Sequence, residues 1–457
     1  MKFDLTIIGN GMIGSLAIFE IAKKFKNKKI AFISPSQRNG SASKAAGAML
    51  NVIAEVDYGL IRDDYQERKI ELGIKAQKSW KEFLDQNRIF KKIETANHTI
   101  VYLSRHATNL EKKCFEKILF FAKKYKRYLK KNSNLKFLKG NNFIADTIFI
   151  KNEGAIDTNE FFKIFDKEII KKKNVHIFND NCNKILKSKK VYNIYLSSGK
   201  KISSDKIILT IGANTKKVLG KIGSNIQDIF YGVGTALSIE SKLDIKNLPK
   251  KTVIRTPNRG STCGVHYVPR LNKKYYIGAG SFISKEPIFT PRAATVEYLL
   301  STSKSEFLKS FGKDKVKIDI GFRPMSFDGK PLIGTLNKHK NIFIVSGTKR
   351  DGLTYSTEII KFMIEWLKNE ENKSQYNPFF GWEPERKPIS YVDRKFAISA
   401  YIENKLAGLL EHNETIKSKK ILIKELSIEA KKMHSKITKK YKLNKNFGVH
   451  PEVLNVI

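Results

Sequence analysis

Hydrophobic positions in the first 24 residues predict a strand that is followed at once by a helix. Phe3, Leu5, Ile7 and Ile8 form a pattern typical of a short buried strand, and residues 15–24 are typical of a helix. A strand that leads directly into a helix is the usual opening of an α/β domain. We therefore expect the chain to begin inside a parallel sheet.

Patterns further along predict a mixed architecture. Residues 28–34 predict a second strand, and residues 58–87 carry apolar side chains at helical spacing. Short strands and turns dominate residues 230–320, which indicates an antiparallel sheet in a second domain. The alternation of helix and strand returns at residues 321–368, so we expect the first domain to be discontinuous and the second to be inserted into it.

These patterns predict an α/β fold in three parts. A discontinuous Rossmann-like domain takes residues 1–90, 145–225 and 320–370; a mainly antiparallel β substrate domain takes residues 91–144 and 226–319; and a basic helical C-terminal extension takes residues 371–457. Two apolar stripes in the extension, Ile398 to Leu409 and Leu422 to Ile437, favour faces that dock on the rest of the chain. A partner surface and contact with a membrane stay open as alternatives.

The turn between the first strand and the first helix carries Gly9, Gly11 and Gly14 in the spacing Gly-x-Gly-x-x-Gly. In a dinucleotide-binding turn, the first glycine permits the tight turn, the second lets the backbone approach the pyrophosphate, and the third lets helix and strand pack closely. The N-terminus of the helix then offers free N–H groups to the phosphates. The alternative is a purely structural glycine turn.

The end of the second strand departs from this pattern. Dinucleotide-binding domains usually carry Asp or Glu there for the ribose hydroxyls, whereas this chain has Ser34 followed by Pro35. A serine hydroxyl binds a ribose more weakly than a carboxylate does. Small residues at 41–50 follow, and they allow a ligand to approach the backbone, although a helix start packed on the sheet would explain them equally well.

Length and composition limit the class of protein. The chain has 457 residues, which suggests two or three domains, and we see no secretory signal and no apolar run that would span a bilayer. Its three cysteines are far apart, so we predict no disulfide framework and no metal site, and a cytoplasmic location is the simplest interpretation. The formal net charge of +42 is explained most simply by a general lysine bias, because lysines are spread along the whole chain. An RNA partner or weak contact with an anionic membrane surface stays open.

The order of the motifs resembles FAD-dependent oxidoreductases of the D-amino acid oxidase type, which include glycine oxidase and sarcosine oxidase. The resemblance covers residues 1–368, and its most specific part is residues 321–334, Gly-Phe-Arg-Pro-Met-Ser-Phe-Asp-Gly-Lys-Pro-Leu-Ile-Gly. Residues 347–353 are similar to the flavin loop of that family, Gly-His-x-x-x-Gly-Leu. Thr348 stands in the place of the histidine, so no histidine role is carried over to it.

The resemblance implies FAD as the cofactor. The residues that we expect to bind it are Gly9, Gly11, Met12, Ile13, Gly14, Ser34, Ser41, Ser43, Ala45, Ala46, Gly47, Gly212, Asp351, Gly352 and Leu353. Some relatives attach the flavin to a cysteine. Since no cysteine is close in sequence to Arg323 or Arg350, we expect FAD to be bound non-covalently.

The resemblance also implies the reaction, in which a hydride passes from the α-carbon of a neutral amine to flavin N5 and leaves an imine that hydrolyses. An arginine suits the carboxylate of an amino-acid substrate, because its planar fork donates two parallel hydrogen bonds. Arg323 is the first candidate, with an ion pair to Asp328 as the alternative. Arg350 is the second candidate, with a salt bridge as the alternative. The third, His266, alternates with Tyr267 along a strand, so only one of them can face the substrate.

Two other functions remain open at this point. The same scaffold would suit oxidation of a 2-hydroxy acid or a sugar-linked alcohol, and the basic tail would suit a flavin-dependent RNA-modification factor. The expected partner is a small amine or amino acid. The sequence does not distinguish oxygen from a quinone as electron acceptor, and it does not define the oligomeric state.

Overall fold

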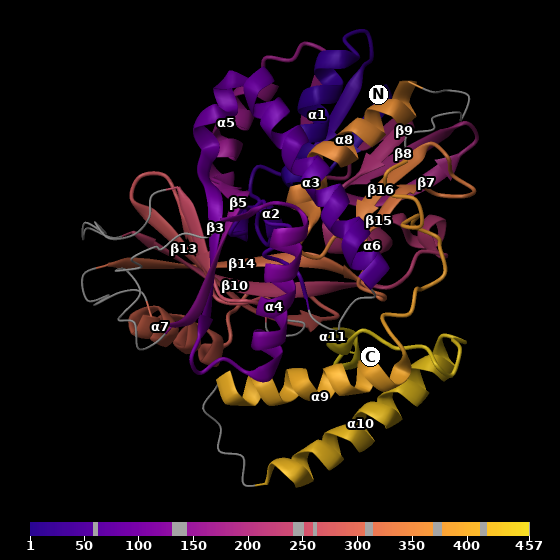
Figure 1. Ribbon diagram of the computed structural model, residues 1–457. Coiled ribbons are helices and arrows are strands. Elements are labelled where there is room, and N and C mark those ends of the chain that lie inside the picture. The colour runs from indigo at the N-terminus through magenta and orange to yellow at the C-terminus, as the bar shows by residue number, and fades with distance from the viewer. Residues whose placement is uncertain are drawn as a thin grey trace.

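The computed structural model describes residues 1–57, 63–129, 144–240, 251–258, 263–306, 314–368, 377–411 and 418–456. It contains two sheets and a helical C-terminal part, as predicted (Figure 1). The helix expected over residues 58–87 is described from Asp63 onward. Other parts of the predicted domains, such as residues 130–143 and 241–250, lie outside the described residues.

The first sheet is built around the N-terminal strand. Within the described residues its strand order is β15-β16-β9-β1-β2-β6, with β7 and β8 joined to β9. Its strands are β1 (Lys2–Ile8), β2 (Ile30–Ile33), β6 (Val175–Phe178), β7 (Cys182–Ser188), β8 (Val191–Leu196), β9 (Lys201–Leu209), β15 (Leu332–Thr335) and β16 (Ile342–Ser346). The five central strands, β16, β9, β1, β2 and β6, run parallel.

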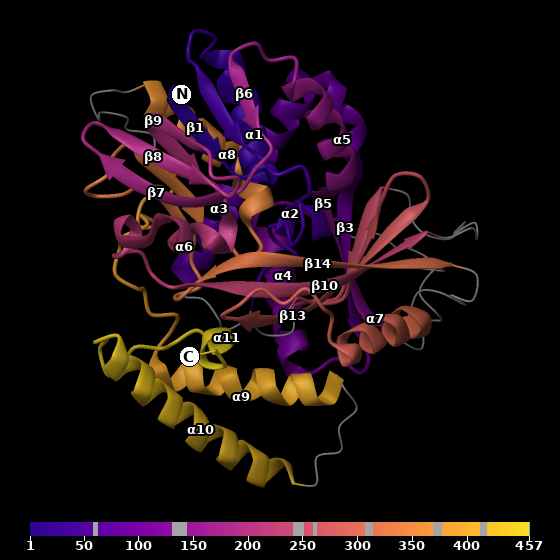
Figure 2. The ribbon, with the colours of Figure 1, turned by 180° about the vertical axis from the view of Figure 1, so that it is seen from behind.

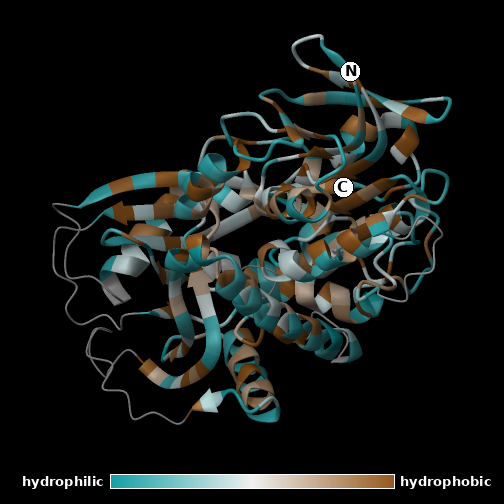
Figure 3. Ribbon diagram, turned by 90° about the horizontal axis from the view of Figure 1, so that it is seen from above, coloured by the Kyte–Doolittle hydropathy of each residue, from teal (hydrophilic) through white to brown (hydrophobic). Residues whose placement is uncertain are grey.

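Helices cover the first sheet. Its helical elements are α1 (Met12–Lys24), α3 (Asp63–Gln86), η1 (Arg88–Ile93), α5 (Thr158–Ile169), η2 (Gly212–Asn214), α6 (Thr215–Leu219), η3 (Gly220–Gly223) and α8 (Gly352–Lys368). Side chains of α1, α3, α5 and α8 share one hydrophobic core with β1 and β2. Several helices carry hydrophobic residues along one side and hydrophilic residues along the other (Figure 3), as expected where one face is buried.

The second sheet lies beside the first and is mainly antiparallel. Its strand order is β14-β10-β13-β12-β11-β3-β5-β4, and within the described residues β11 and β3 are its only parallel pair. Its strands are β3 (Glu94–Ser104), β4 (Tyr128–Leu129), β5 (Ile144–Ile156), β10 (Ile229–Glu240), β11 (Thr252–Arg255), β12 (His266–Pro269), β13 (Lys274–Ser284) and β14 (Lys315–Ser326). Helices α4 (Asn109–Lys124) and α7 (Ala293–Glu306) flank it, and the short α2 (Ala42–Ala45) lies against β14.

Two expected domain boundaries need correction. Strand β5 pairs with β3 and β4, so residues 145–156 belong to the second sheet and not to the Rossmann-like part. Strand β14 pairs with β10 along its whole length, which places residues 320–326 in the second sheet as well. Hydropathy alone misplaced them, because a buried strand looks the same in either sheet.

The C-terminal extension forms a separate helical layer under the second sheet (Figures 1 and 2). Its helices are α9 (Arg394–Glu411), α10 (Lys419–Lys440) and α11 (Pro451–Leu454). Tyr401, Leu426 and Ile437 share a hydrophobic core with Phe230 and Phe327 of the body of the molecule. The apolar stripes therefore dock inside the chain. Within the described residues, no helix is both long and apolar enough to cross a membrane.

Candidate active site

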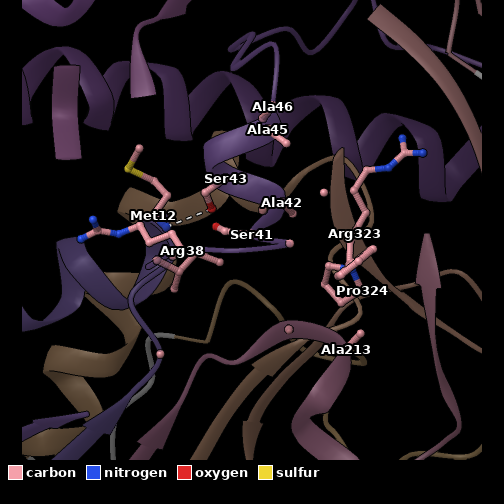
Figure 4. A pocket seen from close by; sticks show the side chains of 18 of the residues that line it. Met12, Arg38, Ser41, Ala42, Ser43, Ala45, Ala46, Ala213, Arg323 and Pro324 are labelled. Carbon is pink, nitrogen blue, oxygen red and sulfur yellow. Dashed lines mark hydrogen bonds between the residues drawn. The ribbon is translucent and has the colours of Figure 1, made fainter. Parts of the chain in front are cut away.

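A cavity of about 740 Å³ lies between the two sheets. Residues from the β1–α1 turn and α2 line one side, and Ala213, Arg323 and Pro324 lie across from them (Figure 4). All the predicted site residues line this cavity except Gly14 and Ser34. Segments more than 300 residues apart in the sequence are thus brought to one site.

The β1–α1 turn has the geometry that a pyrophosphate site needs. Gly9 has φ +110°, and a Cβ there would lie 2.7 Å from the Thr210 carbonyl oxygen. A Cβ on Gly14 would lie 1.9 Å from the carbonyl oxygen of Gly9, so this glycine allows helix and strand to pack together behind the cavity wall. Gly11 and the start of α1 line the cavity, where free N–H groups of a helix attract an anion.

Small residues of the following segment complete this wall. The Ser43 hydroxyl accepts a hydrogen bond of 3.0 Å from the backbone N–H of Met12, at the first turn of α1 (Figure 4). Ser41 caps α2 by accepting from the Lys44 N–H. Ser43 therefore occupies the Met12 N–H, and the small side chains of this segment leave room beside the rest of the helix N-terminus.

A second helix N-terminus also opens on the cavity. Helix α8 begins at Gly352, and Gly352, Leu353 and Thr354 line the cavity. Asp351, directly before the helix, forms a 2.9 Å ion pair with Lys69. Two helices of 13 and 17 residues therefore direct their positive ends at the same space, which suits an anionic cofactor.

Ser34 lies outside the cavity lining, so the structure does not support its expected role at a ribose. Strand β2 ends at Ile33, and the Ser34 N–H is engaged with the carbonyl of Phe178 on β6. The wall there is formed instead by Pro35, Ser36, Gln37 and Arg38. Sequence reasoning missed Arg38, whose guanidinium makes two hydrogen bonds of 2.9 and 2.6 Å to Asp166 and lies 4.2 Å from the ring centre of Phe162.

Arg323 reaches the cavity from β14. Its Nε has no hydrogen-bond partner among the described residues, and its Nη1 lies 3.8 Å from Sγ of Cys263. The alternative pairing with Asp328 does not occur, because Asp328 is bound by Arg386 at 2.9 Å and by Gln227 at 3.1 Å. Arg323 thus lines the cavity without an ion pair to any carboxylate of the described residues.

Arg350 is already paired. Its Nη2 lies 3.0 Å from Oδ2 of Asp57, and its Nη1 lies 3.4 Å from Oε2 of Glu55. Arg255 binds the other oxygen of Glu55, and its Nη2 donates to Asn258 at 2.6 Å. These two arginines and two carboxylates balance one another, so the salt-bridge alternative describes Arg350 and a role at the substrate carboxylate does not fit.

The electrostatics of this cluster agree with its pairing. Burial alone would raise the pKa of Glu55, but Arg255 and Arg350 outweigh it and lower that pKa to about 2. Glu55 is therefore ionised at neutral pH and holds both guanidinium groups. Nothing in the sequence brings Glu55 and Arg255 together, since 200 positions separate them.

His266 lines the cavity, whereas its neighbour Tyr267 packs in the core of the second sheet. Burial, reinforced by the charge of Arg255, lowers the pKa of His266 to about 4. Its Nδ1 lies 3.0 Å from the Gly264 carbonyl oxygen, which assigns the proton to Nδ1 and leaves the lone pair on Nε2. The ring is therefore neutral at pH 7, and Nε2 is a hydrogen-bond acceptor.

Cys263 overturns the reason given for non-covalent binding. Its Sγ lies 3.2 Å from Nη1 of Arg350, and the residue lines the cavity although it is distant in sequence from both arginines. Non-covalent attachment of the cofactor stays a prediction, but the distance in sequence no longer supports it.

Comparison with known proteins identifies the family. Residues 4–366 match the model of the FAD-dependent oxidoreductase family. The chain belongs to this family. The chain is therefore an FAD-dependent oxidoreductase. No curated protein sequence matches it significantly.

Solved structures with the same fold come from several enzymes. Glycine oxidase from Geobacillus kaustophilus is 17% identical, with a TM-score of 0.69 over 84% of this chain and 99% of that one. Iminodiacetate oxidase from Chelativorans sp. BNC1 is 16% identical, with a TM-score of 0.65 over 83% and 98%. L-α-glycerophosphate oxidase from Mycoplasma pneumoniae, solved with FAD bound, is 15% identical, with a TM-score of 0.61 over 84% and 98%.

The residues present fit FAD. The tight Gly9 turn and the two helix N-termini suit the pyrophosphate of a dinucleotide. Gly47 allows the backbone to lie close to Tyr276, since a Cβ at this position would be 2.9 Å from the Tyr276 ring. The Tyr276 hydroxyl, missed by sequence reasoning, donates to the Ala45 carbonyl at 2.9 Å and ties α2 to the second sheet.

Proposed function

We propose that the chain oxidises an amine or amino acid, with Arg323 binding the substrate carboxylate. The observation that carries this proposal is the contrast between the two arginines of the cavity. Arg350 is neutralised by Asp57 and Glu55, whereas Arg323 keeps an unpartnered Nε. The Arg323 guanidinium has no anionic partner among the described residues of the protein, and it can donate two parallel hydrogen bonds to the carboxylate of a bound substrate.

The names of the structural neighbours point to the same substrate class. Glycine oxidase, iminodiacetate oxidase and the L-amino acid deaminase of Proteus vulgaris all act on compounds that carry both an amine and a carboxylate. At 11–17% identity these names support the class and not an individual substrate.

FAD, held by the β1–α1 turn and the first turn of α8, would supply the two-electron acceptor for oxidation of the amine to an imine, which water would hydrolyse. Arg323 fixes the carboxylate and thereby the direction in which the α-carbon points. His266 accepts a hydrogen bond from the amine through Nε2 and so orients its nitrogen, while the partly desolvated cavity disfavours the charged ammonium form. Tyr276 and Phe322 add aromatic surface to the cavity wall and limit the entry of water.

The test is an anaerobic substrate screen with the FAD-loaded protein. We expect glycine, iminodiacetate or another amino acid to bleach the flavin absorbance band, and the matching 2-hydroxy acids to leave it unchanged. Bleaching by a 2-hydroxy acid or by glycerol phosphate alone would replace this proposal with oxidation of an alcohol. A protein that binds FAD but is bleached by none of these compounds would contradict both.

A further inference from the structure

The beginning of α10 projects away from the rest of the molecule (Figures 1 and 2). Residues 419–425 are exposed except for the half-buried Leu422, whereas Leu426, Ala430 and Ile437 are buried against the extension core. The C-terminal part of the helix therefore holds it in place, and the N-terminal turns extend into solvent.

This projecting segment exposes large aliphatic side chains. Ile421 is 60% exposed, Ile423 is 37% exposed and Ile428 is 59% exposed. Ile421 and Ile428 are two helical turns apart and share one face, and Ala430, which packs inside, lies on the opposite face. Ile423 lies near the side of Ala430, so the outward apolar pair is Ile421 and Ile428, two large aliphatic side chains that are each about 60% exposed on one face.

Lysines surround these isoleucines. Helix α10 carries eight lysines and two glutamates, and all eight lysines are exposed. Lys419, Lys420 and Lys424 flank Ile421 and Ile423 directly. A lysine can lay its aliphatic stem beside an apolar surface and still keep its ammonium group in the polar layer above.

We infer that α10 docks on the surface of a bilayer that contains anionic lipid, with Ile421 and Ile428 at the acyl boundary and the lysines among the headgroups. Aliphatic residues ringed by lysine are the pattern of a helix that lies in the membrane interface. The charge of the whole chain, +42, complements such a surface and draws the protein toward it. Nucleic acid fits less well, because α10 offers no aromatic side chain for stacking and no arginine.

The experiment measures partition of the FAD-loaded full chain onto vesicles. Vesicles of phosphatidylcholine with phosphatidylglycerol are compared with vesicles of phosphatidylcholine alone at low and high salt. We expect binding only to the anionic vesicles. Changing Lys419, Lys420 and Lys424 to Ser lowers the partition coefficient about a hundredfold, because each lysine contributes a factor of about five. Changing Ile421 and Ile428 to Ser lowers it roughly tenfold without any change of charge.

The matched control removes the same charge elsewhere. Lys184, Lys187 and Lys190 lie on the β7–β8 hairpin of the first sheet, away from α10 (Figure 1), and their change to Ser leaves most of the binding intact. Because all the altered side chains are exposed, the bound FAD absorbance and the circular dichroism of every variant should match the parent chain.

Four results would overturn the inference. The first is the absence of binding to anionic vesicles at low salt, and the second is equal binding by the α10 variants and the hairpin variant. The third is a dimer of the parent chain that the isoleucine substitutions dissociate, which would assign the surface to a second copy. Tight RNA binding that the lysine changes weaken and the isoleucine changes leave intact, without vesicle binding, would also overturn it.

Discussion

At the scale of single residues, the second and third glycines of the β1–α1 turn, Gly11 and Gly14, have different roles. A Cβ on Gly14 would lie 1.9 Å from the Gly9 carbonyl oxygen, whereas a Cβ on Gly11 would meet only the Ser43 hydroxyl at 3.3 Å. We expect Gly14→Ala to destabilise the FAD-free protein by roughly 3 kcal/mol, because backbone must move. Gly11→Ala should keep that stability and weaken FAD binding. Urea unfolding and FAD titration separate the two, and equal behaviour of both variants would contradict this assignment.

His266 makes stability depend on pH. Its pKa is about 4 in the folded protein, below the ordinary value of about 6.5 for an unfolded chain, so between these values only the unfolded chain binds the proton. The free energy of unfolding therefore falls as pH decreases from 6.5 to 4, by roughly 3 kcal/mol for this residue. We expect His266→Gln to remove this contribution to the pH dependence of the free energy of unfolding, as measured by urea unfolding. His176→Gln, on the exposed part of β6, serves as the control. An unchanged slope in His266→Gln would refute a buried neutral ring.

At the scale of elements, α11 is tied to the flavin loop. Lys349, with φ +47°, places its Nζ 2.9 Å from Oε1 of Glu452 and 3.3 Å from Nε2 of His450. Arg350 and Asp351, which follow directly, line the cavity. The extension therefore supports a loop that lines the cavity.

This contact predicts a remote effect on the cofactor. We expect Glu452→Gln to cost about 2 kcal/mol, because the mostly buried Lys349 loses its carboxylate partner, and to weaken FAD binding. Glu240→Gln breaks an exposed pair with Lys274 and should change neither property. Thermal unfolding and FAD titration test both variants. If Glu452→Gln binds FAD like the parent chain, the extension does not support the loop.

The elements also show what sequence reasoning can reach. The β1–α1 turn follows from its glycine spacing, because the geometry of that turn is local. The assignment of β5 and β14 to the second sheet does not, since pairing with β3 and β10 depends on residues far away in sequence. The ion pairs of Arg350 with Glu55 and Asp57 could not be predicted from the sequence either. The residues next to an arginine in sequence do not show whether it pairs with a carboxylate of the protein or binds one of a substrate.

At the scale of the whole molecule, two sheets enclose the cavity, and a helical layer covers the second sheet from the side opposite the first (Figures 1 and 2). The glycine turn comes from the first sheet, and Arg323 and His266 come from the second. This division predicts that cofactor binding and substrate binding can be changed separately.

One measurement tests the central claim most directly. The FAD-loaded parent chain and Arg323→Ala are titrated anaerobically with an amino-acid substrate and with the amine that lacks its carboxylate. We predict that Arg323→Ala raises the amino-acid concentration for half reduction roughly a hundredfold, since a charged bidentate contact worth about 3 kcal/mol is lost. FAD stays bound, and the amine reduces both proteins at similar concentrations. If Arg323→Ala raises the concentration for half reduction equally for both compounds, or releases FAD, the claim that Arg323 binds the substrate carboxylate is contradicted.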